Sequence, residues 1–350
     1  MEAFYLRYQM NFIRPVGTSR GQMAYKETWF LTLDDGVKIG IGECGMFRGL
    51  SIDDRPDYEE KLQWVCDHIQ WGEAVLYDAL HDFPSIQFGL EMAFRSLRSS
   101  HPALLFPSEF TEGKAAIPIN GLVWMGDRSF MHRQLLDKIQ AEYRCVKMKI
   151  GALDFQQELG LLSFLRSQFN AEKLEIRVDA NGAFTPEEAL SKLKQLAVYE
   201  LHSIEQPIAP NQWEVMRTLC QESPIPIALD EELIGVTGRE AKKELLETLR
   251  PQYIILKPTL VGGFRGSLEW IELAESLGIG WWITSALESN IGLNAIAQWT
   301  YTLQSSRPQG LGTGALYANN FDCPLEVVGD QLFYRPERNW GLYDILPESN

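Results

Sequence analysis

The sequence predicts an α/β protein in which a (β/α)8-type (TIM) barrel follows a smaller α+β domain. Three features of the 350-residue chain lead to this prediction. The first fifty residues alternate apolar and polar side chains, short apolar segments alternate with helical stretches from residue 116 onward, and charged residues end successive apolar segments. We expect an amino-terminal domain at 1–110, the barrel at 115–320, and a segment at 321–350 that packs back on the first domain.

The amino-terminal domain begins with a predicted hairpin. Apolar and polar residues alternate at 27–33, the Asp-Gly pair at 35–36 suits a tight turn, and 37–43 forms the return strand. From 55 to 99, apolar residues recur at helical spacing, and prolines stand where helices begin. Residues 101–113 contain two prolines and show no periodicity, so we expect a linker there.

The barrel prediction depends on eight regularly spaced apolar segments that are rich in Val, Ile and Leu. Nearly continuous apolar strands are typical of parallel sheets that are covered on both faces. No Gly-x-Gly-x-x-Gly motif opens the first helix, which favours a closed barrel over a dinucleotide-binding sheet. The predicted strands are 116–121, 145–151, 174–181, 203–207, 225–230, 253–258, 280–287 and 310–314.

Composition and charge exclude several classes of protein. The formal net charge of −15 would repel nucleic acid and anionic membrane surfaces, and no apolar run reaches the roughly 18 residues needed to cross a bilayer. The start of the chain lacks the pattern of a secretory signal. Five scattered cysteines without a Cys-x-x-Cys pair indicate reduced thiols. We therefore expect a cytoplasmic protein that binds neither nucleic acid nor membranes.

Charged residues stand at the carboxyl ends of five successive predicted strands. They are Lys149, Asp179, Glu205, Asp230 and Lys257, separated by 30, 26, 25 and 27 residues. A charge in an apolar strand is costly unless it is paired or binds a metal. One such residue is usually an ordinary rim residue, but the whole series indicates a site, because this rim is the catalytic face of a closed barrel.

The three carboxylates are predicted metal ligands. Asp179, Glu205 and Asp230 end neighbouring strands, whose axes lie roughly 5 Å apart. Three hard oxygen ligands without His or Cys beside them suit Mg²⁺ or Mn²⁺, and they leave coordination positions open for water and a substrate carboxylate.

The lysines are predicted to perform acid–base chemistry. Lys147 and Lys149 are two residues apart and point to the same side of their strand, while Lys257 lies on the opposite wall. The pattern predicts removal of a proton next to a metal-bound carboxylate, with a lysine as the base. A Schiff-base aldolase and a catalytically silent scaffold are alternatives. The carboxylate cluster argues against the first, and the complete set of charges argues against the second.

These motifs resemble the enolase superfamily and, within it, the muconate-lactonizing subgroup. The resemblance covers essentially the whole chain and implies that Lys149 is the acid/base residue, with Lys257 opposite it. It also implies that the three carboxylates bind the metal and that loops at 15–21 and 46–52 cap the site. The motifs that carry it are Lys-x-Lys at 147–149, Asp179-Ala180-Asn181, Glu205-Gln206-Pro207, Leu229-Asp230-Glu231 and Leu256-Lys257-Pro258.

Two further segments bear on the reaction. The eighth-strand region has Gly312-Thr313-Gly314 where dipeptide epimerases of this subgroup carry Asp-x-Asp, which argues against that activity. The stretch 284–289 resembles the Ser-x-Leu-Glu-Ser segment of certain members of the subgroup. Those members dehydrate 2-succinyl-6-hydroxycyclohexa-2,4-diene-1-carboxylate in menaquinone synthesis, so the resemblance implies a magnesium-dependent lyase. N-acylamino acid racemisation and muconate-type cycloisomerisation are the alternatives.

The substrate is expected to be a small carboxylate. We predict that it contacts Lys147, Asn181, Ser285 and Gly312. Hydroxyl and backbone donors near Ser285 would then hold a succinyl carboxylate without a dedicated cation. The sequence carries no prediction of the oligomeric state.

Overall fold

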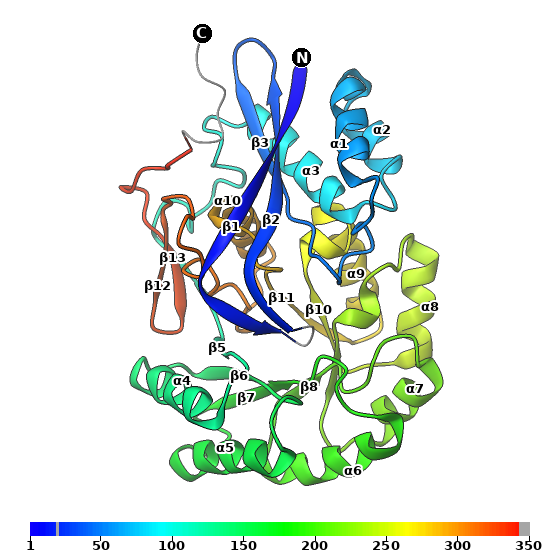
Figure 1. Ribbon diagram of the computed structural model, residues 1–350, viewed down its shortest axis with the longest axis vertical. Coiled ribbons are helices and arrows are strands. Elements are labelled where there is room, and N and C mark those ends of the chain that lie inside the picture. Colours follow the sequence, from blue (N-terminus) through cyan, green and yellow to red (C-terminus); the bar gives the residue numbers. More distant parts are fainter. Residues whose placement is uncertain (19–20, 343–350) are drawn as a thin grey trace.

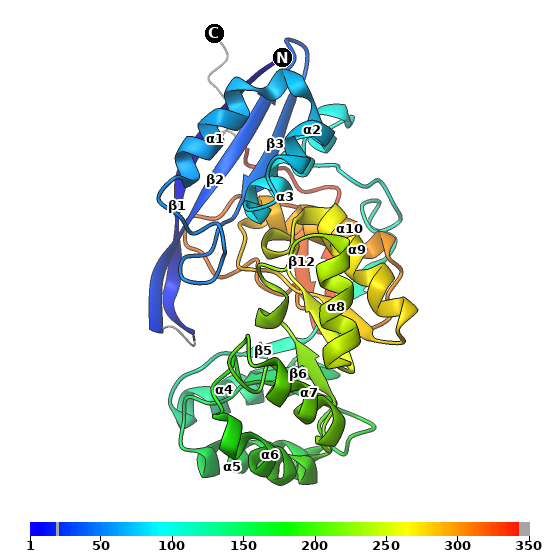
Figure 2. The same ribbon diagram turned by 90° about the vertical axis from the view of Figure 1, so that its right-hand side faces the viewer.

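The computed structural model describes residues 1–18 and 21–342. An antiparallel sheet with its helices, built from the amino-terminal residues, lies at one end of the molecule, and a ring of strands and helices lies at the other (Figures 1 and 2). The predicted combination of a barrel and an α+β domain is confirmed.

Three strands form the amino-terminal sheet in the order β1 (Glu2–Thr18), β2 (Gly21–Asp34) and β3 (Ile39–Cys44). The predicted hairpin is confirmed, because β2 and β3 pair in antiparallel register. In the turn between them, the Asp35 carboxylate accepts hydrogen bonds from two following backbone N–H groups at 2.9 and 2.7 Å. This carboxylate takes the place of a backbone acceptor and holds the turn closed.

Helices α1 (Tyr58–Asp67), α2 (Glu73–Asp78) and α3 (Pro84–Arg98) cover one face of this sheet (Figure 2). Helix α3 begins at a proline, whose missing N–H is not needed in the first turn. Its backbone touches the sheet directly, since a Cβ at Gly42 would lie 1.8 Å from the Gly89 carbonyl oxygen. Glycine is required at this contact.

Seven parallel strands form the barrel sheet, and each pairs with the next one along the chain. A helix follows every strand, which confirms the predicted βα units. No helix in the described part of the chain is both long and apolar enough to cross a membrane. The strands are β5 (Gly121–Val123), β6 (Cys145–Lys149), β7 (Glu175–Asp179), β8 (Ser203–Glu205), β9 (Ile227–Leu229), β10 (Tyr253–Leu256) and β11 (Gly280–Ile283). The helices are α4 (Arg128–Gln140), α5 (Phe155–Gln168), α6 (Pro186–Leu196), α7 (Trp213–Glu222), α8 (Arg239–Leu249), α9 (Gly263–Ser276) and α10 (Asn290–Thr302).

The predicted first barrel strand at 116–121 is wrong as a single element. Its first part, β4 (Ala116–Pro118), pairs with a strand near the carboxyl terminus, and only the following β5 joins the barrel. Pro118 has no N–H group, so one ladder of hydrogen bonds cannot continue through it. The chain therefore changes sheets at this point.

The predicted eighth strand at 310–314 is also shorter than expected. Gln309 forms a parallel bridge to Ile119, and Gly310 forms one to Thr284 at the end of β11. These two bridges close the ring between the first and last strands. Glycine recurs in this segment and has low strand propensity, which accounts for the absence of a longer ladder here.

The carboxyl-terminal hairpin, β12 (Leu325–Val328) and β13 (Gln331–Tyr334), pairs with β4. Just before it, the Phe321 ring lies 5.3 Å from the rings of both Tyr8 and Phe30, measured between centroids. The segment thus contacts the amino-terminal sheet as well as the barrel. Its last residues, 343–350, lie outside the described part, and the division of the chain into three units stays a prediction.

Side chains fill the interior of the barrel below the rim. Arg177 is 1% exposed and lies with its guanidinium carbon 4.1 Å from the ring centroid of Trp282. Arg177 also donates to the Pro308 carbonyl oxygen at 3.0 Å and to Glu175 at 2.6 Å. The interior is therefore packed at this level of the barrel.

Candidate active site

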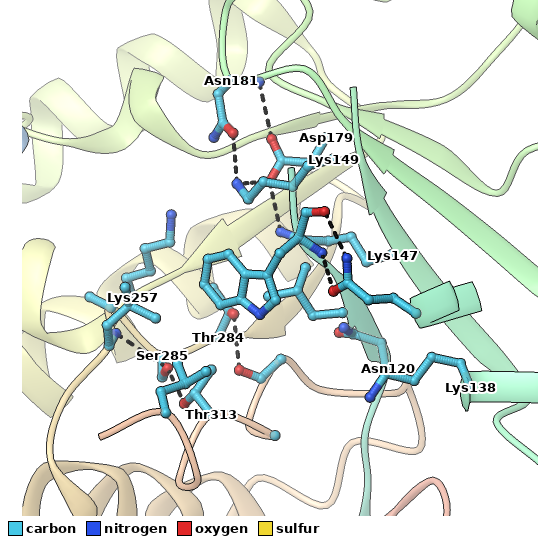
Figure 3. Close-up of a pocket in the computed structure, with 18 of the residues that line it drawn as sticks. Asn120, Lys138, Lys147, Lys149, Asp179, Asn181, Lys257, Thr284, Ser285 and Thr313 are labelled. Carbon is cyan, nitrogen blue, oxygen red and sulfur yellow. Dashed lines mark hydrogen bonds and ion pairs between the residues drawn. The ribbon is translucent and has the colours of Figure 1, made fainter. Parts of the chain in front are cut away.

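A cavity of about 290 Å³ lies at the carboxyl ends of the barrel strands (Figure 3). Glu205 and Asp230 are each 2% exposed and lie behind its wall. The structure brings all the predicted site residues to this one place. Those that line the cavity directly are Lys147, Lys149, Asp179, Asn181, Lys257, Ser285 and Gly312.

Strand pairing sets the charged residues side by side. Lys149 is opposite Asp179 where β6 pairs with β7, and Asp179 is opposite Glu205 where β7 pairs with β8. Asp230 and Lys257 directly follow the next two strands, β9 and β10. Because the carboxyl ends of parallel strands meet at one rim, charges that are distant in sequence converge.

The lysines form ion pairs with these carboxylates. Lys147 Nζ lies 2.6 Å from Oε2 of Glu205 and 2.9 Å from Oδ2 of Asp179. Lys149 Nζ lies 2.8 Å from the same oxygen of Asp179, and Lys257 pairs with Asp230. Three ammonium groups thus balance three buried carboxylates.

Burial and charge oppose each other in this cluster. Burial, followed by the negative charge of Asp179, raises the pKa of Glu205 to about 8. Burial would also raise the pKa of Asp179, but the charges of Lys147 and Lys149 hold it well below its usual range. Burial works against the charged form of Lys147, yet Asp179 and Glu205 raise its pKa above the ordinary value. The lysine charges therefore compensate Glu205 less fully than they compensate Asp179.

The chemistry of this donor set suits a divalent cation. Asp179, Glu205 and Asp230 offer hard anionic oxygens, and the buried Oε1 of Glu205 has no hydrogen-bond partner among the described residues. As the side chains stand, no three acidic, His or Cys side chains in the described ranges converge closely enough to hold an ion. Lysine ammonium groups lie between the carboxylates instead. A cation would have to take over these oxygens from the lysines.

Asn181 orients Lys149. Its Oδ1 accepts a hydrogen bond from Lys149 Nζ at 2.6 Å, and its Nδ2 donates to Oε1 of Glu231 at 2.9 Å. The backbone of Asn181 has a φ of 44°, a left-handed conformation that asparagine adopts more readily than most residues. Two acceptors, on Asp179 and Asn181, therefore hold the Lys149 ammonium at the edge of the cavity.

Polar side chains after the last strands form the opposite side of the cavity (Figure 3). The hydroxyls of Ser285 and Thr313 lie 2.6 Å apart, and Thr284 Oγ1 donates to the Gly310 carbonyl oxygen at 3.0 Å. A Cβ at Gly312 would lie 3.3 Å from a side-chain carbon of Ile119, so a larger residue there would narrow the space. This side can offer hydroxyl donors to a ligand.

Several lining residues were not predicted from the sequence, among them Asn120, Trp124, Lys138 and Glu231. Glu231 directly follows the predicted ligand Asp230, and this adjacency was a signal that could have identified it. The other three are on or beside β5 and α4, where no strand-end pattern marks them.

One of the two predicted cap loops contributes to the cavity. Phe47 and Leu50, in the 46–52 segment, line it. In the other segment, residues 15–18 belong to β1 and residue 21 begins β2, and none of these described residues lines the cavity. Residues 19–20, at the tip of this predicted loop, lie outside the described part.

The sequence of this chain matches the model of a known protein family. Residues 131–338 match the family described as enolase C-terminal domain-like, which is more than half of the chain. The chain belongs to the enolase superfamily. The resemblance that the strand-end motifs imply is therefore confirmed.

Relatives within the superfamily share one name. An o-succinylbenzoate synthase of Desulfotalea psychrophila is 46% identical, with 95% of this chain and 98% of the relative covered. An o-succinylbenzoate synthase of Vibrio cholerae is 28% identical, with 91% of each chain covered.

Solved structures show the same similarity. MenC from Desulfotalea psychrophila superposes with a TM-score of 0.85 and 43% identity, over 95% of this chain and 99% of that one. A muconate lactonizing enzyme from Pseudomonas fluorescens superposes with a TM-score of 0.79 and 21% identity, over 97% and 96% of the two chains. The second likeness shows the fold alone.

Proposed function

We propose that this chain is an o-succinylbenzoate synthase, a lyase that converts 2-succinyl-6-hydroxycyclohexa-2,4-diene-1-carboxylate to o-succinylbenzoate and water. The observation that carries the proposal is the 46% identity, over 95% of the chain, to a relative of that name. The site adds chemical support, because Lys149 and Lys257 lie on different sides of one cavity (Figure 3). The lysines of the site pair with the buried carboxylates.

Lys149 is the proposed acid/base residue. Its Nζ takes the proton from the ring carbon that bears the carboxylate, and the electron pair passes into the carboxylate to give an enediolate. The same ammonium then gives its proton to the departing hydroxyl group, so that water leaves and the ring becomes aromatic. Asp179 and Asn181 would hold this nitrogen toward the reacting carbon, since both already accept hydrogen bonds from it.

The remaining charges would stabilise the negative charge that develops. Asp179, Glu205 and Asp230 would hold Mg²⁺, and the bound ion would neutralise negative charge on the substrate carboxylate. Lys257 would add positive charge from the other side of the cavity. Lys147, which pairs with both Asp179 and Glu205, would keep these two carboxylates together.

Substrate contacts and location complete the proposal. Ser285 and Gly312 would contact the substrate from the side opposite Lys149, and Phe47 and Leu50 would cover it. We place the enzyme in the cytoplasm, with a small-molecule carboxylate as its partner.

An assay of diene consumption tests the proposed function. Purified chain with Mg²⁺ should remove the ultraviolet absorbance of the diene and form o-succinylbenzoate, and a chelator should abolish this activity until Mg²⁺ or Mn²⁺ is restored. The same preparation should be tested for racemisation of N-succinyl amino acids. A much higher kcat/KM for racemisation than for dehydration would replace the proposal with a racemase function.

A further inference from the structure

The cavity contains a cation that the proposed mechanism does not use. Lys138, in the second half of α4, lines the same cavity as Lys149 and Lys257 (Figure 3). Lys147, Lys149 and Lys257 each pair with a buried carboxylate. Among the described residues, Lys138 forms no ion pair within 4.0 Å and no side-chain hydrogen bond, so it is the one lining cation without an anionic partner.

The barrel wall is shaped to let this lysine reach inward. Helix α4 lies outside β5, and the Lys138 stem passes over Gly121 of that strand. A Cβ at Gly121 would lie 2.8 Å from Cδ of Lys138 and 2.9 Å from a ring carbon of Tyr143. The Lys138 ammonium lies 4.8 Å from the centroid of the Tyr143 ring. Any larger residue at 121 would displace the stem, so the glycine here provides space.

A second polar group accompanies Lys138. Asn120 is 5% exposed and lines the cavity beside the lysine in Figure 3. Within the described residues its carboxamide has no hydrogen-bond partner, although its backbone N–H donates to the Gln309 carbonyl oxygen at 3.0 Å. The amide atoms of Asn120 keep some exposure to the cavity and are not paired within the described residues, which leaves them available to a ligand.

The chemistry of this end of the cavity suits an anion. Burial lowers the pKa of Lys138, and the charge of Asp137 beside it acts in the opposite direction. Asp137 also lines the cavity but is exposed and forms no ion pair with the lysine. A carboxylate bound here would gain a charge-assisted hydrogen bond from Lys138 and an amide donor from Asn120.

We propose that Lys138, together with Asn120, binds the distal carboxylate of a dicarboxylate substrate. The inference rests on the proposed function, in which the substrate and its product carry a ring carboxylate and a succinyl carboxylate. The ring carboxylate belongs beside Lys149, where the proton is removed. The second carboxylate then has a cation of its own, in addition to the hydroxyl donors at Ser285. Lys138 is thus assigned a role in substrate recognition and none in proton transfer.

Ligand binding separates this role from catalysis. Calorimetry of the Mg²⁺-loaded enzyme should compare o-succinylbenzoate with 2-butanoylbenzoate, which has a methyl group in place of the distal carboxylate. Lys138→Met keeps the stem over Gly121 and removes the charge. We expect it to weaken o-succinylbenzoate binding roughly 10- to 100-fold and to leave 2-butanoylbenzoate binding within about twofold. In turnover, KM should rise by a similar factor while kcat changes little.

Matched variants control for indirect effects. Lys138→Arg retains the charge and should bind o-succinylbenzoate more tightly than Lys138→Met does. Asn120→Asp should weaken only the binding of o-succinylbenzoate, because the new carboxylate repels the distal one. Lys243→Met, on the exposed face of α8, should leave the binding of both ligands unchanged. Unchanged o-succinylbenzoate binding by Lys138→Met, or equally weakened binding of both ligands, would overturn the proposed role of Lys138. Neither result would affect the proposed function. A wild-type enzyme that neither binds nor forms o-succinylbenzoate would overturn the proposed function and this inference with it.

Discussion

Buried carboxylates occur in two regions of this molecule and are satisfied in different ways. Where the amino-terminal domain meets the barrel, Glu43 and Glu91 accept hydrogen bonds from backbone N–H groups at the starts of barrel helices. In the active site, Asp179 and Glu205 are held by the ammonium group of Lys147. Backbone donors are fixed by the fold, whereas an ammonium on a four-carbon stem can move away. The carboxylates between the domains therefore keep their hydrogen-bond partners, whereas the carboxylates of the active site can exchange a lysine for another cation.

Glu43 illustrates the fixed arrangement. It is fully buried at the end of β3, and both of its oxygens are satisfied across the domain boundary. Oε1 accepts from the Ser289 N–H at 2.9 Å and the Thr28 hydroxyl at 2.9 Å, and Oε2 accepts from the Ser289 hydroxyl at 2.5 Å and the Gly292 N–H at 2.8 Å. A negative charge at the start of α10 also complements the helix dipole. This contact fixes the segment that carries Ser285 into the site.

Glu91 performs the same task for α9. This helix has Gly262 at its N-cap and no side-chain cap of its own. Glu91, on α3, accepts hydrogen bonds from the Phe264 N–H at 2.6 Å and the Arg265 N–H at 3.1 Å. Two residues of the amino-terminal domain therefore cap two consecutive barrel helices. The 46–52 segment, which contributes to the cavity, follows closely after the strand that carries Glu43.

The first prediction concerns Lys149, which shares Asp179 with Lys147 in the active site. Lys149→Ala should lower kcat by roughly 10³-fold, because positioned acid–base groups contribute about 10² to 10⁴-fold. Its stability should change little, since Asp179 keeps the ion pair with Lys147 at 2.9 Å. Steady-state kinetics and thermal unfolding of the same preparation check both parts. A variant within roughly tenfold of wild-type kcat would show that another group removes the proton.

Much of this site could be predicted from the sequence because parallel βα units impose an order. Each strand ends at the same rim, so the regular steps from Lys149 to Lys257 were enough to place five charges around one space. The exact ends of the ring were not predictable in the same way, because the pairing of β4 with β13 depends on residues more than 200 positions away. Only Pro118 gave a local hint that the strand is interrupted.

The contacts between domains and the second cation were beyond sequence reasoning. Glu43 and Ser289 are 246 residues apart, and nothing in either segment specifies the other before the domains dock. Lys138 is on a helix, where a lysine is ordinarily a solvent-exposed residue, and its direction depends on the space over Gly121. These features arise from packing between distant segments, which no local pattern encodes.

The second prediction compares the two regions directly with matched substitutions. Glu43→Gln should lower the free energy of unfolding by about 2 to 3 kcal/mol, because an amide NH₂ would face backbone N–H donors and a charged acceptor would be lost. Glu205→Gln should change it by less than about 1 kcal/mol, since one oxygen has no partner and Lys147 retains Asp179. Urea unfolding of the metal-free proteins measures both. Equal losses in the two variants would mean that the site carboxylates are as structural as those between the domains.

The third prediction concerns the pH dependence of the domain contact at Glu91. Burial raises the pKa of this carboxyl from 4.5 to about 8, although the two N–H groups that it accepts favour its charged form. Between pH 4.5 and about 8, the folded state keeps a proton that the unfolded state has released, so this group makes stability fall as the pH rises through that window. Below the window both states are protonated, and above it the effect is constant.

Glu91→Gln removes this titration while imitating the protonated acid. The difference in unfolding free energy between variant and wild type should therefore shift in favour of the variant by at least about 2 kcal/mol from pH 5 to pH 8.5. Denaturant titrations at several pH values measure it, and Glu272→Gln, on the exposed side of α9, serves as the control for a general charge effect. A pH-independent difference between Glu91→Gln and wild type would mean that Glu91 stays charged across the whole range. The start of α9 would then accept a charged carboxylate at every pH tested, and this domain contact would contribute no pH dependence to stability.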